Sequence, residues 1–159
     1  MIKLTNSLEE YLKTIYLLIT TEQKAKVTTI SKKMNCTKPS VNRALKTLKE
    51  EKLIWYEAYG DIILTDEGVN VARKIVKRYD TLKLFLTEVL EVEDSLAIKE
   101  AEQMKHAVSE DTIGKLEKYI NKILDLGDLE CCYDSNNTKC KTCVKLTAKN
   151  RLKKEKEIR

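Results

Sequence analysis

The sequence has few residues that break helices and no apolar run long enough to cross a bilayer. Its 159 residues include only four glycines and one proline, and long periodic segments with so few breakers predict a mostly helical protein. No apolar run approaches the roughly 20 residues that span a membrane, which excludes a membrane protein. The first ten residues, MIKLTNSLEE, lack the apolar core of a signal peptide, so we expect a cytoplasmic protein.

Acidic residues are missing from one stretch of the chain. Residues 23–49 contain no Asp or Glu, although 35% of the chain is charged. A surface that meets nucleic acid has to neutralise phosphates, and carboxylates there would oppose binding. The gap therefore favours a DNA-binding face, and a solvated basic face is the alternative. The stretch holds eight cations, namely Lys24, Lys26, Lys32, Lys33, Lys38, Arg43, Lys46 and Lys49.

Charge also divides the chain into three parts. The net charge is +4 over residues 1–64, −3 over residues 65–126 and +4 over residues 127–159. Two basic ends around an acidic middle predict contact with a polyanion at the ends and a different task between them.

Periodicity predicts a winged helix in residues 1–64. Apolar residues recur at helical spacing over residues 7–21, a short helix follows at 27–34, and a third begins at the capping residue Thr37 and runs to about residue 52. Next comes a segment rich in β-branched and aromatic residues, which is centred on Tyr59-Gly60-Asp61 and predicts a hairpin. Three helices followed directly by a hairpin make a helix-turn-helix with a β-hairpin wing.

The third helix supplies most of the residues that we expect at DNA. Val41, Leu45 and Leu48 form its buried stripe, so the polar residues lie on its other faces. Some of these side chains should contact bases and the outer lysines should contact phosphates, while the tip of the wing should touch the backbone or the minor groove. The predicted DNA-binding residues are Lys38, Pro39, Ser40, Asn42, Arg43, Lys46, Lys49 and Tyr59.

Three further helices are predicted after the wing. The first runs from Thr65 to about Leu90 and has a broad apolar face, which is typical of a core helix or a dimer seam. The others cover residues 94–106 and 109–127. The charged residues 145–159 show no apolar period and predict a frayed helix or a disordered tail.

Five stretches of the sequence, in this order, resemble one known protein family. They are Ser7 to Tyr16, Ser40-Val41, Leu64 to Gly68, Phe85-Leu86 and Glu100 to Ser109. The family is that of the diphtheria toxin repressor and the manganese transport regulator. The resemblance implies a homodimeric transcriptional repressor, which is not an enzyme and binds a palindromic operator in double-stranded DNA when it carries iron or manganese. It also implies a helical dimerisation and metal-sensing domain over residues 65–126, after a DNA-binding domain over 1–64.

The resemblance also marks where the family binds its metal, and this sequence departs from the pattern there. Two lysines and a tyrosine replace ligands, and a protonated lysine has no lone pair for a metal and repels it. The family's metal site is therefore expected to be absent or weakened. Alternatively, a lysine between two glutamates supplies the positive charge, which would lock the first helix to the dimer core and make a metal-independent regulator. The family's ligand positions fall on Glu10, Lys13, Tyr79, Glu102, Lys105 and His106, of which Glu10, Glu102 and His106 remain possible ligands.

Four cysteines in the third part of the chain predict a second site. Cys140 and Cys143 form a CxxC pair, and Cys131 and Cys132 are adjacent. In a cytoplasmic protein such a cluster favours metal over disulfides. The ligand is zinc, in a structural role, or an iron–sulfur cluster, as a sensor. Two disulfides and four idle thiols are the alternatives. Cys36 is predicted to be a small buried residue.

Two other classes of function compete with a DNA-binding regulator. A winged helix can also serve protein–protein contact, but the acid-free stretch argues against that use. A redox protein built on the CxxC pair is the second rival. It lacks the strand–helix context of such proteins and has no acid or base partner nearby.

Overall fold

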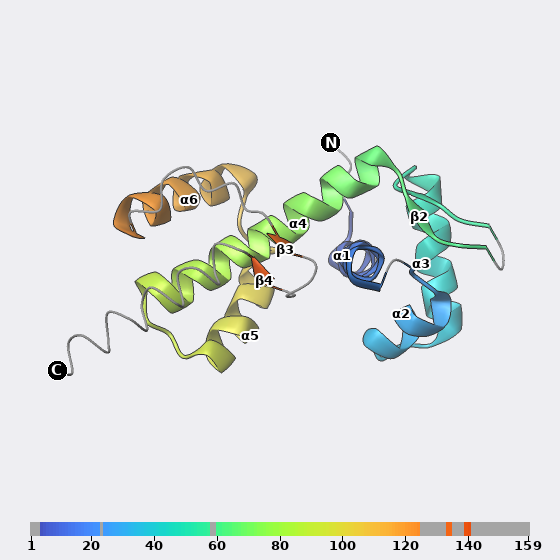
Figure 1. The fold of residues 1–159 in the computed structure, drawn as a ribbon, viewed down its shortest axis with the longest axis horizontal. Coiled ribbons are helices and arrows are strands. Elements are labelled where there is room, and N and C mark those ends of the chain that lie inside the picture. Colours follow the sequence, from blue (N-terminus) through green and yellow to red (C-terminus); the bar gives the residue numbers. More distant parts are fainter. Residues whose placement is uncertain (1–3, 23, 58–59, 125–132, 135–138, 141–159) are drawn as a thin grey trace. The chain divides into compact units, whose positions relative to one another are not determined.

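The computed structural model describes residues 4–22, 24–57, 60–124, 133–134 and 139–140 (Figure 1). They are mostly helical, which confirms the prediction of fold class. The chain forms two compact units, residues 1–76 and 77–159. The domain limits predicted from charge and resemblance, 1–64, 65–126 and 127–159, remain a prediction. Within the described part of the chain, the helices are too short or too polar to traverse a bilayer.

The N-terminal unit is a three-helix cluster with a hairpin. Helix α1 spans Asn6–Glu22, α2 spans Val27–Lys33 and α3 spans Lys38–Glu50, and strands β1 (Ile54–Trp55) and β2 (Ile63–Leu64) follow. The three helices contact one another, and β1 lies against α3. The apolar stripes that the periodicity predicts face inward, where they form a core of Tyr11, Leu12, Ile15, Leu18, Ile30, Val41, Leu45, Leu48, Leu53 and Ile54.

The turn between α2 and α3 has a defined backbone geometry. Asn35 adopts a left-handed conformation, with φ of 48°. Its N–H donates to the carbonyl of Lys32, and the N–H of Cys36 donates to the carbonyl of Ser31. This pair of hydrogen bonds is the Schellman arrangement, which ends a helix and tolerates asparagine at the left-handed position. The turn of the predicted helix-turn-helix is therefore produced by residues 31–36, which end α2 at this point.

Helix α3 begins at a capping residue and ends before a residue in the left-handed conformation. The Oγ1 of Thr37 accepts from the N–H of Ser40 at 3.4 Å, and Pro39 lies in the first turn, where no amide hydrogen is needed. At the far end Lys52 is left-handed, with φ of 59°, and the N–H of Leu53 donates to the carbonyl of Leu48. The helix therefore ends at Glu50, two residues before the predicted end.

The wing is short and is fixed at its base. Trp55 pairs with Ile63 in the antiparallel register of β1 and β2. Thr65 closes the base, because its N–H and its hydroxyl both bond the carbonyl of Leu53. Helix α4 (Asp66–Leu84) begins at once, and its residue Gly68 lies so close to Leu53 that a Cβ would be 1.9 Å from the Leu53 carbonyl oxygen.

The C-terminal unit contains the rest of α4 and three further helical segments. A π-helical segment, η1, covers Phe85–Val89, and α5 (Asp94–Met104) and α6 (Glu110–Leu124) follow. The sequence predicts one continuous helix from 65 to 90, so the π-helical turn is a correction. The last part of α4 packs inside this unit through Leu82 and Leu84. Leu82 lies in a core with Leu86, Ala97, Ala101 and Ile113, and Leu84 lies in a second cluster with Ile120.

A second hairpin lies near the C-terminus. Strand β3 (Tyr133–Asp134) pairs antiparallel with β4 (Lys139–Cys140), and Tyr133 is opposite Cys140. Sequence patterns did not predict this hairpin. The predicted tail, residues 145–159, lies outside the described residues.

Candidate DNA interface and metal positions

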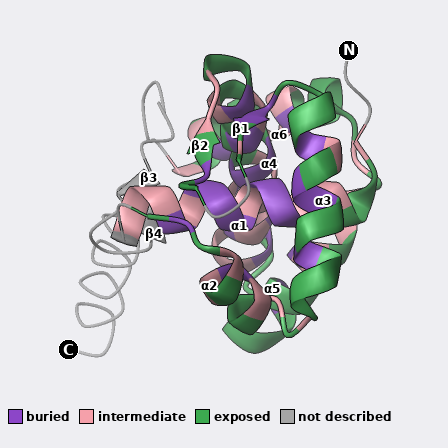
Figure 2. Cartoon of the chain, turned by 90° about the vertical axis from the view of Figure 1, so that its right-hand side faces the viewer, coloured by how far each residue is buried: buried purple, intermediate pink, exposed green. Residues whose placement is uncertain are grey.

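Helix α3 divides into a buried face and an exposed face. Val41, Ala44, Leu45 and Leu48 are buried, and Figure 2 shows most of the rest of α3 in the colour of exposed residues. The helical spacing puts residues 39, 43 and 46 on the side opposite the buried stripe. The predicted DNA-binding residues on this helix are all exposed, namely Lys38, Pro39, Ser40, Asn42, Arg43, Lys46 and Lys49. Tyr59 lies outside the described residues.

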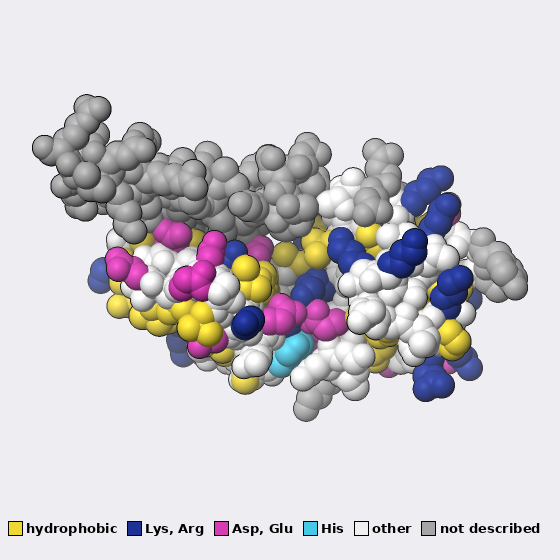
Figure 3. Space-filling model, turned by 90° about the horizontal axis from the view of Figure 1, so that it is seen from below, with side chains coloured by type: hydrophobic (Ala, Val, Ile, Leu, Met, Phe, Trp, Pro, Cys, Tyr) yellow, Lys and Arg dark blue, Asp and Glu magenta, His cyan; other side chains and the backbone are white. Residues whose placement is uncertain are grey.

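The acid-free stretch forms a basic surface. All eight of its cations are exposed, and none of them forms an ion pair with another described residue. On the face drawn in Figure 3, Lys and Arg side chains gather over the N-terminal unit. Cations that carry no internal partner remain available for phosphate, which is what a nucleic-acid interface requires.

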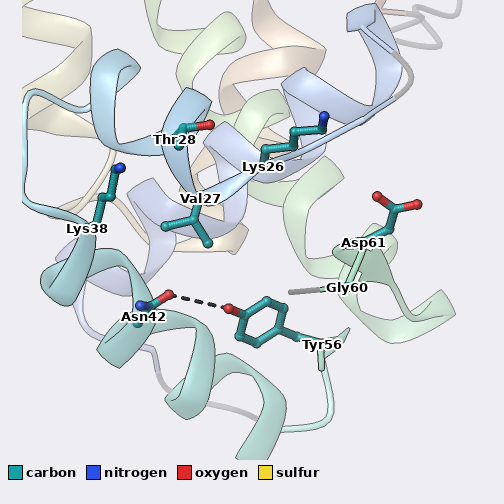
Figure 4. A pocket seen from close by; sticks show the side chains of 8 residues that line it. All are labelled: Lys26, Val27, Thr28, Lys38, Asn42, Tyr56, Gly60 and Asp61. Carbon is teal, nitrogen blue, oxygen red and sulfur yellow. Dashed lines mark hydrogen bonds between the residues drawn. The ribbon is translucent and has the colours of Figure 1, made fainter. Parts of the chain in front are cut away.

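A groove of about 560 Å³ lies between the start of α3, the start of α2 and the wing. Figure 4 shows Tyr56, from the wing, pointing at Asn42 of α3, and the tyrosine hydroxyl donates to Oδ1 of Asn42 at 3.3 Å. This bond leaves the NH₂ of Asn42 free of Tyr56 and fixes the orientation of the side chain. Sequence analysis did not name Tyr56, since its partner is 14 residues away. The groove is lined by Lys26, Val27, Thr28, Lys38, Asn42, Tyr56, Gly60 and Asp61.

The metal positions of the N-terminal unit carry an ion pair. The ammonium of Lys13 lies 2.8 Å from the carboxylate of Glu10, one turn earlier on α1. Both side chains are largely buried, at 16% and 27% exposure. The glutamate that the resemblance names as a possible ligand is therefore engaged by a lysine of its own helix.

The metal positions of the C-terminal unit carry a second ion pair. Lys105 follows the last turn of α5 and is fully buried, and its ammonium contacts the carboxylate of Glu102. The same ammonium lies 5.9 Å from the ring centroid of Tyr79, within the range of a cation–π contact. Arg78 adds a second cation, because its guanidinium donates to the carbonyl of Lys105 at 3.1 Å. Sequence analysis did not identify Arg78.

These residues do not fit a divalent metal. Among the residues that the structure describes, no three His, Cys, Asp or Glu side chains come together as a metal-binding group. His106 is half-buried, and the carboxylates of Glu10 and Glu102 each contact an ammonium. In each unit the ammonium raises the electrostatic cost of placing a divalent cation at that unit's own positions. The sequence therefore departs from the family's metal-binding pattern, and the contacts at these positions also differ from those of a metal site.

Cys36 is half-buried and hydrogen-bonded, whereas the sequence predicts a small buried residue. The hydroxyl of Tyr11 donates to its Sγ at 3.4 Å, across the helix-turn-helix. This hydrogen bond, together with burial and the electrostatic effect of Cys36, raises the pKa of Tyr11 to about 12. Cys131, Cys132, Cys143 and the side chain of Cys140 lie outside the described residues, so the predicted cysteine site remains a prediction.

Both parts of the chain match models of one protein family. Residues 3–62 match the N-terminal DNA-binding domain of the iron dependent repressors. Residues 65–125 match the metal binding and dimerisation domain of the same repressors. The chain belongs to the iron dependent repressor family. This confirms the resemblance to the diphtheria toxin repressor and the manganese transport regulator.

Relatives support the same assignment. An uncharacterized HTH-type transcriptional regulator of Methanocaldococcus jannaschii is 32% identical over 123 residues, which cover 77% of this chain and 98% of that protein. The HTH-type transcriptional regulator MntR of Shouchella clausii is 28% identical over 135 residues, which cover 85% of this chain and 87% of that protein. Both are named as transcriptional regulators, which confirms the prediction that the chain is not an enzyme.

A solved structure has the same fold. The manganese regulator SloR superposes with a TM-score of 0.63 and 29% identity, over 72% of this chain and 53% of that one. The chain thus spans about half the length of the solved structure that it matches. The two-strand hairpin after the helical DNA-binding domain agrees with this fold.

Proposed function

We propose that this chain is a homodimeric repressor that binds a palindromic operator in double-stranded DNA through α3. The observation that carries the proposal is the exposed polar face of α3, which lies beside a wing and contains four cations and no carboxylate before Glu50. Family membership gives this surface a DNA-binding context. A winged helix used only for protein contact would have no need to exclude acids over 27 residues.

The residues of α3 divide into two roles. Arg43 and Lys46 lie opposite the buried stripe, where a recognition helix reads the major groove, and guanine is the base edge that their donors suit best. Lys38 lines the groove beside the wing, and Lys49 lies in the last turn of α3. Both suit phosphates, which position the protein without reading sequence. Asn42, held by Tyr56, can donate its amide to a base or a phosphate.

Dimerisation is proposed for the C-terminal unit. Several large apolar side chains remain about half exposed there, and an exposed group of this kind marks an interaction surface. Tyr119 and Ile123 are one turn apart on α6, so they share a face. Changing both to Glu should dissociate the dimer in sedimentation experiments, whereas Lys118→Glu, at an exposed position further round α6, should leave it intact. The exposed apolar residues are Leu90, Leu96, Ile98, Tyr119 and Ile123.

A second candidate function is metal sensing by the four cysteines. The pairing of Tyr133 with Cys140 brings the ends of segment 133–140 together, and Cys131-Cys132 and Cys143 flank those ends in sequence. This arrangement supports one shared zinc ion or iron–sulfur cluster. Anaerobic purification with an absorption spectrum and elemental analysis separates the two, because only the cluster is coloured. Either group would make the repressor respond to a transition metal.

The test of DNA binding starts with selection of sites from a pool of random duplexes. Wild-type protein should enrich a palindrome, and Arg43→Ala should then lose discrimination between that site and random DNA. Lys49→Ala should weaken both by a similar factor and reduce the salt slope by about one. Lys118→Ala, at an exposed position of α6 away from the proposed dimer face, is the matched control. Equal losses from both α3 variants on both DNAs would contradict the assigned roles, and enrichment of no site would contradict the proposal.

A further inference from the structure

The six positions at which the family binds metal are electrically balanced in this chain without a metal. They hold two carboxylates, Glu10 and Glu102, and two ammonium groups, Lys13 and Lys105. In each compact unit one carboxylate contacts one ammonium of the same unit, three residues further along the chain. Metal ions supply positive charge to clustered carboxylates, and here lysines at the ligand positions themselves supply it.

The pair in the C-terminal unit is the more informative of the two. Among the described residues, Lys105 is the one charged side chain that is buried. Burying an ammonium is unfavourable, and an apolar residue of similar size often replaces a buried ion pair without loss. Lys105 nevertheless holds this position, with a carboxylate and an aromatic face as neighbours. An apolar residue could fill this position, so the presence of lysine indicates that its positive charge has a function.

We infer that Lys13 and Lys105 take the place of the family's metal ions, so that the protein binds DNA without a divalent cation. Each lysine neutralises the glutamate that would otherwise need a metal, and each does so within its own compact unit. Arg78, at the carbonyl of Lys105, adds to the positive potential that disfavours a divalent ion. The inference about DNA rests on the proposed function, whereas the inference about metal does not.

The first test measures metal binding alone. Manganese(II) is the probe, because it prefers oxygen and imidazole ligands and does not compete well for the cysteine thiolates. Chelator-treated full-length chain is titrated with manganese(II), and free manganese is followed by its electron paramagnetic resonance signal. Wild type should bind no manganese(II) at micromolar concentrations. One ion bound per chain at those concentrations would overturn the inference.

Charge reversal provides the second arm. The double variant Lys13→Glu, Lys105→Glu restores two carboxylates and should bind manganese(II) at least about a hundredfold more tightly than wild type. Lys99→Glu, an exposed change on α5, is the control and should behave as wild type. If the double variant unfolds in chelator, its melting temperature should rise on addition of manganese(II). If the double variant neither binds manganese(II) more tightly nor melts at a higher temperature with it, these positions are not a displaced metal site and the inference fails.

The DNA arm separates this inference from the proposed function. Wild type should bind its selected operator equally well in EDTA and in manganese(II), whereas the double variant should lose binding in EDTA and recover it with manganese(II). A wild-type protein that needs manganese(II) for DNA would refute metal independence and leave the DNA-binding proposal standing. A wild type that binds no duplex under either condition would refute the proposed function, and the manganese titration would still decide the metal inference.

Discussion

Gly68 is the position at which one methyl group should be most damaging. It lies in the first turn of α4 and packs against the backbone of Leu53, at the base of the wing. A Cβ added there would lie 1.9 Å from the Leu53 carbonyl oxygen and 2.9 Å from its carbonyl carbon. Both are backbone atoms, so no side-chain rotation relieves the contact. Because the oxygen also accepts hydrogen bonds from Thr65, any shift disturbs the wing as well.

The change in the free energy of unfolding caused by Gly68→Ala is the sum of two opposing effects. Overpacking against a fixed backbone costs about 3 kcal/mol, and the higher helix propensity of alanine returns about 1 kcal/mol. Gly68→Ala should therefore lower the free energy of unfolding by about 2 kcal/mol. Gly114 is the matched control, because it lies within α6 and an added Cβ meets no atom within 4 Å. Gly114→Ala should raise stability by about 1 kcal/mol.

Urea unfolding followed by circular dichroism measures both variants. The single tryptophan, Trp55, lies in β1, so its fluorescence reports the unfolding of the N-terminal unit. Gly68→Ala should move that fluorescence transition to lower urea, and Gly114→Ala should not lower either transition. A Gly68→Ala protein as stable as wild type would refute the close packing of α4 against Leu53.

Three further predictions concern single side chains. Tyr56→Phe removes the hydrogen bond to Asn42 and should weaken operator binding about fivefold. It should leave binding to random DNA unchanged in the same anisotropy titration, and an unchanged operator affinity would discard the positioning role. Lys52→Gly relieves the left-handed strain after α3 and should raise the free energy of unfolding by about 1 kcal/mol in urea titrations, whereas a lower value would contradict it. Tyr11 has its pKa raised from 10.0 to about 12 by the hydrogen bond to Cys36, so the fold favours the protonated phenol. Its contribution to stability is complete below pH 10 and is lost as the pH rises from 10 to 12. The tyrosinate absorbance that Tyr11→Phe removes should therefore appear near pH 12, and its appearance near pH 10 would count against the hydrogen bond.

Local sequence signals predict most of the N-terminal unit. Thr37 and Pro39 mark the start of α3, and the spacing of its apolar residues alone indicates which face of the helix is buried. The end of α3 is two residues earlier than predicted, because Lys52 adopts a left-handed conformation without the usual glycine. Nothing in the periodicity distinguishes the π-helical turn η1 from an ordinary helix, since both keep apolar residues on one side.

The sequence predicts which residues form the candidate sites, but it does not predict which of them contact one another. The acid-free stretch indicates the DNA surface, and family resemblance locates Lys13 and Lys105. The bond from Tyr56 to Asn42 and the donation from Arg78 to Lys105 join residues 14 and 27 positions apart. Such contacts depend on how helices and strands pack, and one sequence does not specify that packing. The burial of Lys105 is likewise a tertiary result, because lysine is seldom buried.

Whether Lys13 and Lys105 act in place of the metal can be decided by one titration. Purified full-length protein is added to its labelled operator duplex in EDTA, at about 0.15 M salt, and the titration is repeated with manganese(II) in place of EDTA. We expect binding in the range of about 10 nM under both conditions. Binding that disappears in EDTA and returns with manganese(II) would contradict this expectation, because the two lysines would then not be acting in place of the metal.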